Sequence, residues 1–298
     1  MHDPTRTYFQ LDEAESRYET ARAAILPLPF ERTTSYGKGT GTGPAAILEA
    51  SQAIELWDEE LGAEPFRMGI ATLPPFAPES PDLGAALDEV RAEARRHMEA
   101  GKLLVSLGGE HSLTSALAFA ARDVHGEIGV VQLDAHADLR DTYDGTPWSH
   151  AAVMRRIVDA GMPTLAVGIR SLSTPEAELV RERGLPVLWG RDLGSASLLQ
   201  DFRRHLEALP ERVYLTFDID YFDPALVPAT GTPEPGGGDW YTTLAILRSL
   251  FQTKHVVAMD LVELAPVPGH PASDFLAAKL TYKFLAYLDE KRRQEGKV

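Results

Sequence analysis

Three side chains that can bind a metal ion, Asp134, His136 and Asp138, occupy alternate positions of the sequence. The apolar run 128–133 directly before them predicts a buried strand. Because alternate residues of an extended segment point to the same side, two carboxylates and an imidazole can converge where this strand ends. Such ligands suit Mn(II), Zn(II) or Fe(II). Aspartate is also common where strands end in turns, so turn formation is the alternative for this motif taken alone.

Two further predicted strands end in residues of the same kind. His111 follows the apolar run 103–107, and Asp218 and Asp220 follow the run 213–217. A structural zinc site is usually closed by four ligands, so a larger set of Asp and His favours two metal ions that share carboxylates. Carboxylates that neutralise two divalent ions leave a shared water free to ionise to hydroxide.

Short runs of Val, Ile and Leu alternate with helical segments along the chain. This pattern predicts an α/β fold of three α/β/α layers, with a central parallel sheet of about eight strands. Ligands bind outside the carboxyl ends of the strands in such sheets. The expected strands cover residues 23–28, 66–73, 103–107, 128–133, 165–168, 187–189, 213–217 and 256–261. The expected helices cover residues 43–51, 81–100 with Ser80 as N-cap, 113–124, 150–160, 175–183, 197–209, 240–251 and 273–288.

Composition and charge limit the classes of function. No linker, charge block or repeat divides the 298 residues, which indicates a single domain over residues 1–298. The net charge of −15 argues against nucleic acid or an anionic membrane as the main partner. The absence of cysteine excludes disulfides and a thiol nucleophile. Residues 1–6 lack the features of a signal peptide, and no apolar run reaches the roughly 20 residues of a membrane span, so we expect a cytoplasmic protein.

Several motifs, in this order, resemble the signatures of the ureohydrolase (arginase/agmatinase) family. They are Gly108-Gly109-Glu110-His111-Ser112, Asp134-Ala-His-Ala-Asp138, Ser149-His150, Asp218-Ile-Asp-Tyr-Phe-Asp-Pro224, Thr230-Gly-Thr-Pro-Glu-Pro-Gly-Gly237 and Asp260-Leu-Val-Glu263. The resemblance begins at Ser35-Tyr36 and covers nearly the whole chain. It implies an arginase-like fold and, because ureohydrolases are commonly trimers or hexamers, a homotrimer or homohexamer.

The resemblance also implies a site of two Mn(II) ions. Six side chains would hold them: His111 and His136 as terminal ligands, Asp134 and Asp218 as bridges, and Asp138 and Asp220 to complete the pair. A hydroxide between the metals would attack the guanidinium carbon of the substrate, and Asp138 would pass a proton to the leaving amine. The products would be urea and an amine.

Two residues outside the metal set match positions that the family uses for substrate binding and proton transfer, and a third is a weaker candidate for the pocket. Glu263 corresponds to the carboxylate that binds the guanidinium, and such pairs can form two parallel hydrogen bonds. His150 corresponds to a histidine that moves protons, and Thr232 is a weaker candidate for contact with substrate. After His150 the chain has Ala151-Ala-Val-Met154, where many agmatinases have Gly-Thr-Pro-Phe. This departure concerns the wall of the pocket.

The choice among guanidino substrates depends on the segment that follows Asp138. Arginases have an Asn there for the amino acid head group, whereas this chain has Leu139-Arg-Asp-Thr142 and no Asn before Ser149. Asp141 and Asp144 are candidates for an acidic rim that would suit a primary ammonium. We therefore expect a small cationic guanidino substrate, agmatine, which would give putrescine and urea.

Alternatives stay open at this point. Another guanidino compound could be the substrate: N1-aminopropylagmatine, guanidinobutyrate or arginine. A metal-binding relative without catalytic activity and a mononuclear zinc deacetylase on a related fold are further alternatives.

Overall fold

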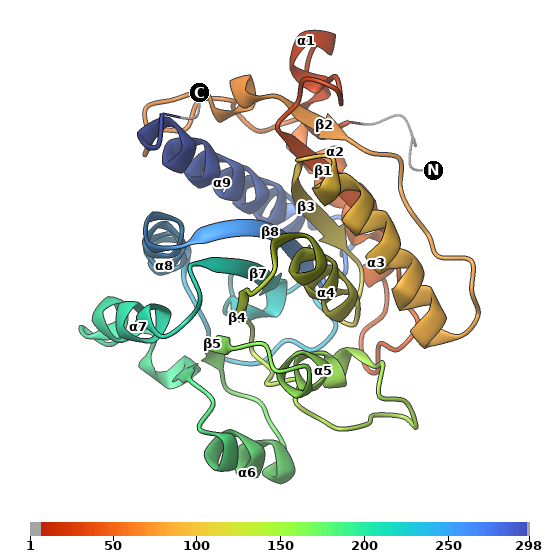
Figure 1. Ribbon diagram of the computed structural model, residues 1–298, viewed down its shortest axis with the longest axis vertical. Coiled ribbons are helices and arrows are strands. Elements are labelled where there is room, and N and C mark those ends of the chain that lie inside the picture. The colour runs from red at the N-terminus through yellow and green to blue at the C-terminus, as the bar shows by residue number, and fades with distance from the viewer. Residues whose placement is uncertain (1–6, 297–298) are drawn as a thin grey trace.

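An eight-stranded sheet forms the centre of the computed structural model, which describes residues 7–296 (Figure 1). The strand order is β2-β1-β3-β8-β7-β4-β5-β6, and every neighbouring pair is parallel. The strands are β1 (Ala23–Leu28), β2 (Ile70–Thr72), β3 (Leu103–Gly108), β4 (Gly129–Leu133), β5 (Thr164–Ile169), β6 (Val187–Trp189), β7 (Arg212–Asp218) and β8 (His255–Val262). The expected parallel sheet is confirmed. Residues 1–6, on which the expectation about a signal peptide rests, lie outside the described residues.

Helices cover both faces of this sheet (Figure 1). They are α1 (Glu13–Ser16), α2 (Gly43–Ser51), α3 (Leu83–Glu99), α4 (Leu113–His125), α5 (Val153–Asp159), α6 (Thr174–Arg183), α7 (Leu198–Glu207), α8 (Trp240–Thr253) and α9 (Ala272–Gln294). One apolar core joins α2, α7, α8 and α9 to one face, and a second core joins α3, α4, α5 and α6 to the other. Neighbouring strand residues alternate between these cores, as Val130 and Val131 do in β4. The three α/β/α layers are thus confirmed.

Several boundaries differ from those expected. The last helix, α9, continues to Gln294 and not to 288, and the segment expected as a helix over 150–160 begins with a 3-10 turn, His150–Ala152. Residues 66–73 do not form one strand: Pro65–Met68 is a 3-10 helix, and Gly69 has a φ of 80°, which ends it before β2 begins. The helix expected after Ser80 begins later, at Leu83. Asp82 is its N-cap, because its carboxylate accepts a hydrogen bond of 2.9 Å from Ala85 N.

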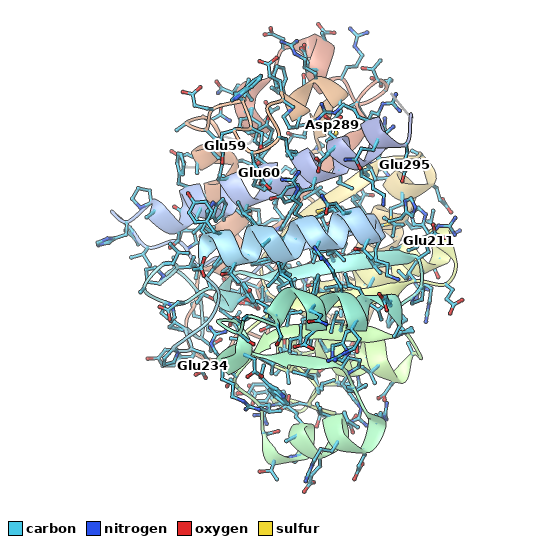
Figure 2. The ribbon with its side chains drawn as sticks, turned by 90° about the vertical axis from the view of Figure 1, so that its left-hand side faces the viewer. Glu59, Glu60, Glu211, Glu234, Asp289 and Glu295 are labelled. Atoms are coloured by element: carbon cyan, nitrogen blue, oxygen red, sulfur yellow. The ribbon has the colours of Figure 1, made fainter. Side chains whose placement is uncertain are left out.

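A buried ion pair attaches the segment between α2 and β2 to α9. Nζ of Lys283 lies 2.9 Å from Oδ2 of Asp58, and neither side chain is exposed. The same ammonium lies 3.2 Å from Oε2 of Glu60, to which Tyr287 OH donates a hydrogen bond of 2.7 Å. Figure 2 shows Glu60 beside this helix. Loss of the lysine would leave a buried carboxylate without its counter-charge, so this contact stabilises the fold.

The amino ends and the carboxyl ends of the strands lie on different sides of the molecule, and the candidate ligands lie on only one of them. Glu211 precedes β7 and Glu234 follows it in the chain, and the two lie on opposite sides of the molecule (Figure 2). The side marked by Glu234 is the one where the parallel strands end, and the candidate metal ligands gather there. Within residues 7–296, none of the helices is both long and apolar enough to span a bilayer.

Candidate metal centre and substrate pocket

Four adjacent strands in the middle of the sheet, β3, β8, β7 and β4, bring the candidate residues together. His111 follows β3, Asp134 follows β4, Asp218 ends β7, and Glu263 follows β8. These residues are far apart in the sequence. They meet because the carboxyl ends of parallel strands lie along one edge.

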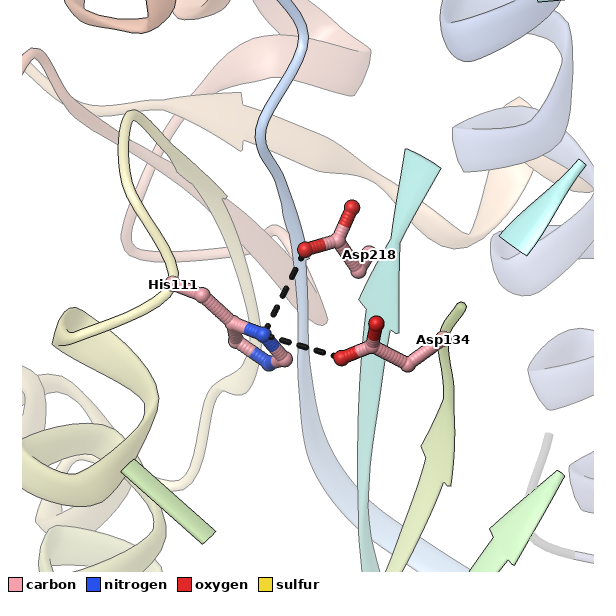
Figure 3. Close-up of side chains that lie close together, drawn as sticks. All are labelled: His111, Asp134 and Asp218. Atoms are coloured by element: carbon pink, nitrogen blue, oxygen red, sulfur yellow. Dashed lines mark ion pairs between the residues drawn. The ribbon is translucent and has the colours of Figure 1, made fainter. Parts of the chain in front are cut away.

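The first group of ligands surrounds one nitrogen of His111 (Figure 3). Its Nδ1 lies 3.1 Å from Oδ2 of Asp134, 3.4 Å from Oδ2 of Asp218 and 3.0 Å from Oδ2 of Asp138. Two atoms that bind one cation at about 2.1 Å and at a right angle lie about 3 Å apart. Nδ1 is buried and makes no hydrogen bond within the described residues. The arrangement therefore fits a divalent cation.

A second group shares Asp134 with the first. Asp134, His136 and Asp220 can place one ligand atom each around a common point. Nδ1 of His136 lies 2.8 Å from Oδ2 of Asp220 and 3.7 Å from Oδ1 of Asp134. One oxygen of Asp134 thus faces each histidine, so this carboxylate can bridge two cations.

The charges in this centre require compensation. Burial, together with the charges of Asp220 and Asp138, raises the pKa of Asp134 to about 7. Burial and the same kind of repulsion raise the pKa of Asp218 well above its usual value. Burial lowers the pKa of His136, but Asp220 and Asp134 outweigh it and bring that pKa to about 11. Without cations the site retains protons, and divalent ions would replace them.

A chain of hydrogen bonds behind His111 sets the orientation of its ring. Thr216 Oγ1 donates to Oδ1 of Asp260 at 2.7 Å and lies 2.9 Å from Nε2 of His111. Since the hydroxyl proton points to Asp260, the neutral imidazole must donate Nε2–H to Thr216. Its Nδ1 lone pair then faces the carboxylates, as metal ligation requires.

Two residues of the site have unusual backbone angles. Asp138 has a φ of 52° and Glu263 a φ of 65°, values that cost of order 1–3 kcal/mol for residues other than glycine. Hydrogen bonds hold both: Asp138 O accepts from Met154 N at 3.0 Å, and Glu263 N donates to Gly109 O at 2.7 Å. On its other side Gly109 permits the close approach of Phe30, because a Cβ there would lie 2.0 Å from the carbonyl oxygen of Phe30. Such strain is typical of functional sites.

A cavity of about 270 Å³ opens above the candidate metal ligands. Glu263, His150 and Thr232 all line it, as do the described ligands except Asp134, which lies buried beneath. Burial raises the pKa of Glu263 to about 8, and backbone donation from His111 opposes the rise. The residues that the motifs single out for substrate therefore border the same space as the candidate metal ligands.

The cavity wall differs from the expectation in one respect. Neither Asp141 nor Asp144 lines the cavity, and Asp141 instead pairs with Arg156 at 2.9 Å. The expected acidic rim is therefore wrong at both positions. In the segment after His150, only Ala151 reaches the cavity, and residues 152–154 are buried in the fold.

Two further side chains, Arg170 and Glu176, support the site through contacts that no motif predicts. Arg170 donates hydrogen bonds to carbonyl oxygens in two parts of the connection between β7 and α8, including those of Asp220 at 2.7 Å and Glu234 at 3.0 Å. Glu176 accepts from Leu139 N at 2.9 Å, next to Asp138. Arg170 belongs to Gly168-Ile-Arg-Ser171, which resembles agmatinases more than arginases, and Glu176 stands three residues after Ser173 in a capping box. Neither pattern predicts these two contacts.

Comparisons with known proteins agree with this geometry. Residues 21–286 match the profile of the Arginase family. The chain is 41% identical to the N(1)-aminopropylagmatine ureohydrolase of Synechocystis sp., over 99% of this chain and 100% of that protein. It is 33% identical to the agmatinase of Pyrococcus horikoshii, over 87% of this chain and 89% of the relative. The crystal structure of agmatine ureohydrolase of Thermoplasma volcanium superposes with a TM-score of 0.86 and 31% identity, over 97% of both chains.

Proposed function

Because the chain belongs to the arginase family and is a ureohydrolase, a hydrolase of guanidino C–N bonds, we propose that its substrate is N1-aminopropylagmatine. The products would be urea and the triamine that remains after loss of the amidino group. The choice of this substrate is supported by 41% identity to an N(1)-aminopropylagmatine ureohydrolase, against 33% to an agmatinase. The two ligand groups that share Asp134 carry the proposal of guanidino hydrolysis.

The positions of four residues around the cavity suit them to bind the substrate or to transfer protons. Glu263 lines the cavity, and its carboxylate would accept hydrogen bonds from the substrate guanidinium and orient it. Asp138 lies 3.0 Å from His111 and at the cavity wall, where it would take a proton and return it to the leaving amine. His150 would exchange protons with the substrate from the opposite loop. Thr232 would contact the substrate beside Glu263.

We propose two Mn(II) ions in the ligand groups. When bound, two divalent ions lower the pKa of a water that they share and so supply a nucleophile at neutral pH. Oxygen and imidazole ligands suit Mn(II), although the same donor set also accepts Zn(II) or Fe(II). Metal analysis of the purified protein, followed by reconstitution of activity with each ion separately, would test the identity of the metal.

Agmatine is the second candidate, as the sequence motifs favour it. It is the same guanidino compound without the aminopropyl extension, so the reacting end would bind in the same way. Guanidinobutyrate is a third, favoured by Arg140, a cation that lines the cavity and could pair with a carboxylate. However, Arg140 already lies over the Tyr143 ring at 5.2 Å and 4.0 Å from Glu176, which reduces its availability.

The test is urea release by the Mn(II)-loaded protein. We expect the highest kcat/KM with N1-aminopropylagmatine, a lower value with agmatine, and much lower values with guanidinobutyrate and arginine. Preference for another of these guanidines would retain the hydrolytic chemistry and replace only the substrate. A protein with two bound metals that releases urea from none of them would contradict the proposal.

The assembly and location of the protein stay predictions. We propose a homotrimer or homohexamer in the cytoplasm that takes part in polyamine synthesis, as the family resemblance implies. Light scattering of the purified protein gives the mass of the assembly and tests the first of these statements. A monomer at micromolar concentration would contradict it.

A further inference from the structure

We infer that Thr33 and Glu110 are positioning residues that keep a proton on Nδ1 of His150, so that the ring, when neutral, is the tautomer protonated on Nδ1. The Nε2 lone pair of this tautomer is then presented to the substrate. The inference rests on the proposed role of His150 in substrate chemistry. It assigns a reason to a buried carboxylate that neither ligates a metal nor lines the cavity.

Glu110 is fully buried and acts only as a hydrogen-bond acceptor. Its Oε2 accepts from the backbone N–H groups of Arg32, at 2.5 Å, and Thr33, at 2.6 Å. Its Oε1 accepts from the hydroxyls of Ser112, at 2.6 Å, and Thr33, at 2.8 Å. A carboxylate has about four lone-pair sites, so these four donors fill them. Its hydrogen bonds to Glu110 therefore set the position of the Thr33 hydroxyl.

The Thr33 hydroxyl has a single proton, which it donates in its hydrogen bond to Glu110. Its oxygen can only accept from other partners. It does so from the backbone N–H of His150 at 3.1 Å, and it lies 3.1 Å from Nδ1 of the same residue. A hydrogen bond between Thr33 and the ring therefore requires the proton on Nδ1.

The remaining ring nitrogen, Nε2, makes no hydrogen bond to the part of the chain that the structure describes, and the ring borders the substrate cavity. A neutral imidazole protonated on Nδ1 has its lone pair on Nε2, the form that can accept a proton from an amine or guanidinium. The Tyr143 ring packs edge-on against it at a centroid distance of 5.6 Å, which limits rotation. The same arrangement, carboxylate to threonine to histidine, orients His111 through Asp260 and Thr216.

A competing donor is present and must be tested. Ser149 Oγ lies 3.3 Å from Nδ1 of His150 and could donate to it, which would require the opposite tautomer. The contact to Thr33 is shorter, and the Thr33 oxygen also holds the histidine backbone. These two observations favour Thr33 as the partner that decides the tautomer.

The kinetic test compares Thr33→Val, which removes the hydroxyl and retains the shape and the backbone N–H, with Thr33→Ser, which retains the hydroxyl. We expect Thr33→Val to lower kcat for the preferred guanidine about 10- to 100-fold with little change in KM, and Thr33→Ser to restore most of it. Thr242→Val is the matched control, because its hydroxyl also donates to a carboxylate, that of Asp239, and the residue does not line the cavity. We expect that control to change kcat less than about threefold.

A double-mutant cycle shows whether Thr33 acts through His150. In the His150→Asn background, Thr33→Val should have almost no further effect on kcat. An equal loss in both backgrounds would overturn the inference, as would a larger loss in Ser149→Ala than in Thr33→Val.

The position of the proton can be measured without any activity. Solid-state 15N NMR of the full-length, histidine-labelled protein loaded with diamagnetic Zn(II) distinguishes protonated from bare ring nitrogens, and His150→Asn identifies the signals. We expect a protonated Nδ1 and a bare Nε2 in the wild type, and loss of this pattern in Thr33→Val. An Nδ1 without a proton in the wild type would overturn the inference. If no guanidine released urea, the proposed function would fail while this measurement would still decide the tautomer.

Discussion

Oε1 of Glu263 accepts a hydrogen bond of 2.6 Å from the backbone N–H of His111. The carboxylate proposed to bind the guanidinium is thus attached to the residue whose ring belongs to the first ligand group. A shift in either would move the other, so the position of the substrate carbon is linked to the position of the metal ligands.

This link makes Glu263→Gln an informative variant. The amide oxygen can still accept from His111, so metal content should be unchanged. The loss of a charged hydrogen bond to the guanidinium, worth about 1.5–3 kcal/mol, should lower kcat/KM by roughly 10- to 150-fold. Steady-state kinetics together with metal analysis would check this. Full activity in the variant would remove Glu263 from substrate binding.

Metal binding should depend on pH. In the metal-free protein the pKa of Asp134 is about 7, raised by burial and by Asp220 and Asp138. Burial lowers the pKa of His136, but Asp220 and Asp134 raise it to about 11. Both groups hold protons below these values and must release them to bind a cation, so affinity should rise with pH, most steeply below about 7 and more gradually up to about 11.

Calorimetric titration of the metal-free protein in two buffers with different ionisation enthalpies measures this release. We expect more than one proton to leave at neutral pH. Binding that releases no proton and has the same affinity across this range would show that the ligands are already deprotonated.

Arg170 should stabilise the loops around Asp220. Its guanidinium donates to carbonyl oxygens of Asp220 and Glu234, and Arg170→Met would leave these acceptors unpaired. A charged hydrogen bond contributes about 1.5–3 kcal/mol, so the free energy of unfolding should fall by at least that order. Arg191→Met is the control, since that side chain is 75% exposed. Thermal denaturation and metal retention of the two variants should differ clearly, and equal curves would contradict the assignment.

Tyr36 should distinguish the longer from the shorter substrate. Its side chain is 81% exposed and lines the cavity, where an aromatic ring can attract the extra ammonium of N1-aminopropylagmatine. An exposed cation–π contact contributes about 0.5–1 kcal/mol, so Tyr36→Ala should raise KM for that substrate about two- to fivefold and leave agmatine nearly unchanged. Tyr36→Phe retains the ring and should behave like the wild type. Equal effects on both substrates would place the extension elsewhere.

The elements were predictable where the local pattern was strong. The apolar runs before His111, Asp134 and Asp218 form strands that end within one residue of the expected positions. They were recognisable because buried strands of a parallel sheet are short continuous runs of Val, Ile and Leu. The segment 66–73 failed this reasoning, since Pro65 and Gly69 impose a turn before the strand. The prediction of Ser80 as N-cap was wrong because Asp82, two residues later, is also a capping residue and caps the helix instead.

By itself, the sequence determined the types and order of the candidate ligands and substrate residues and the strands that they follow. Ligand chemistry needs particular side chains, and these leave a recognisable pattern at strand ends. Only the tertiary structure decided which oxygen of Asp134 faces which histidine, that Asp141 pairs with Arg156 and not with the cavity, and that Thr33 lies against His150. A threonine hydroxyl or an arginine has no distinctive spacing, and its role depends on contacts across 117 residues in the case of Thr33. Such contacts arise from packing the strands and loops together, which no local pattern encodes.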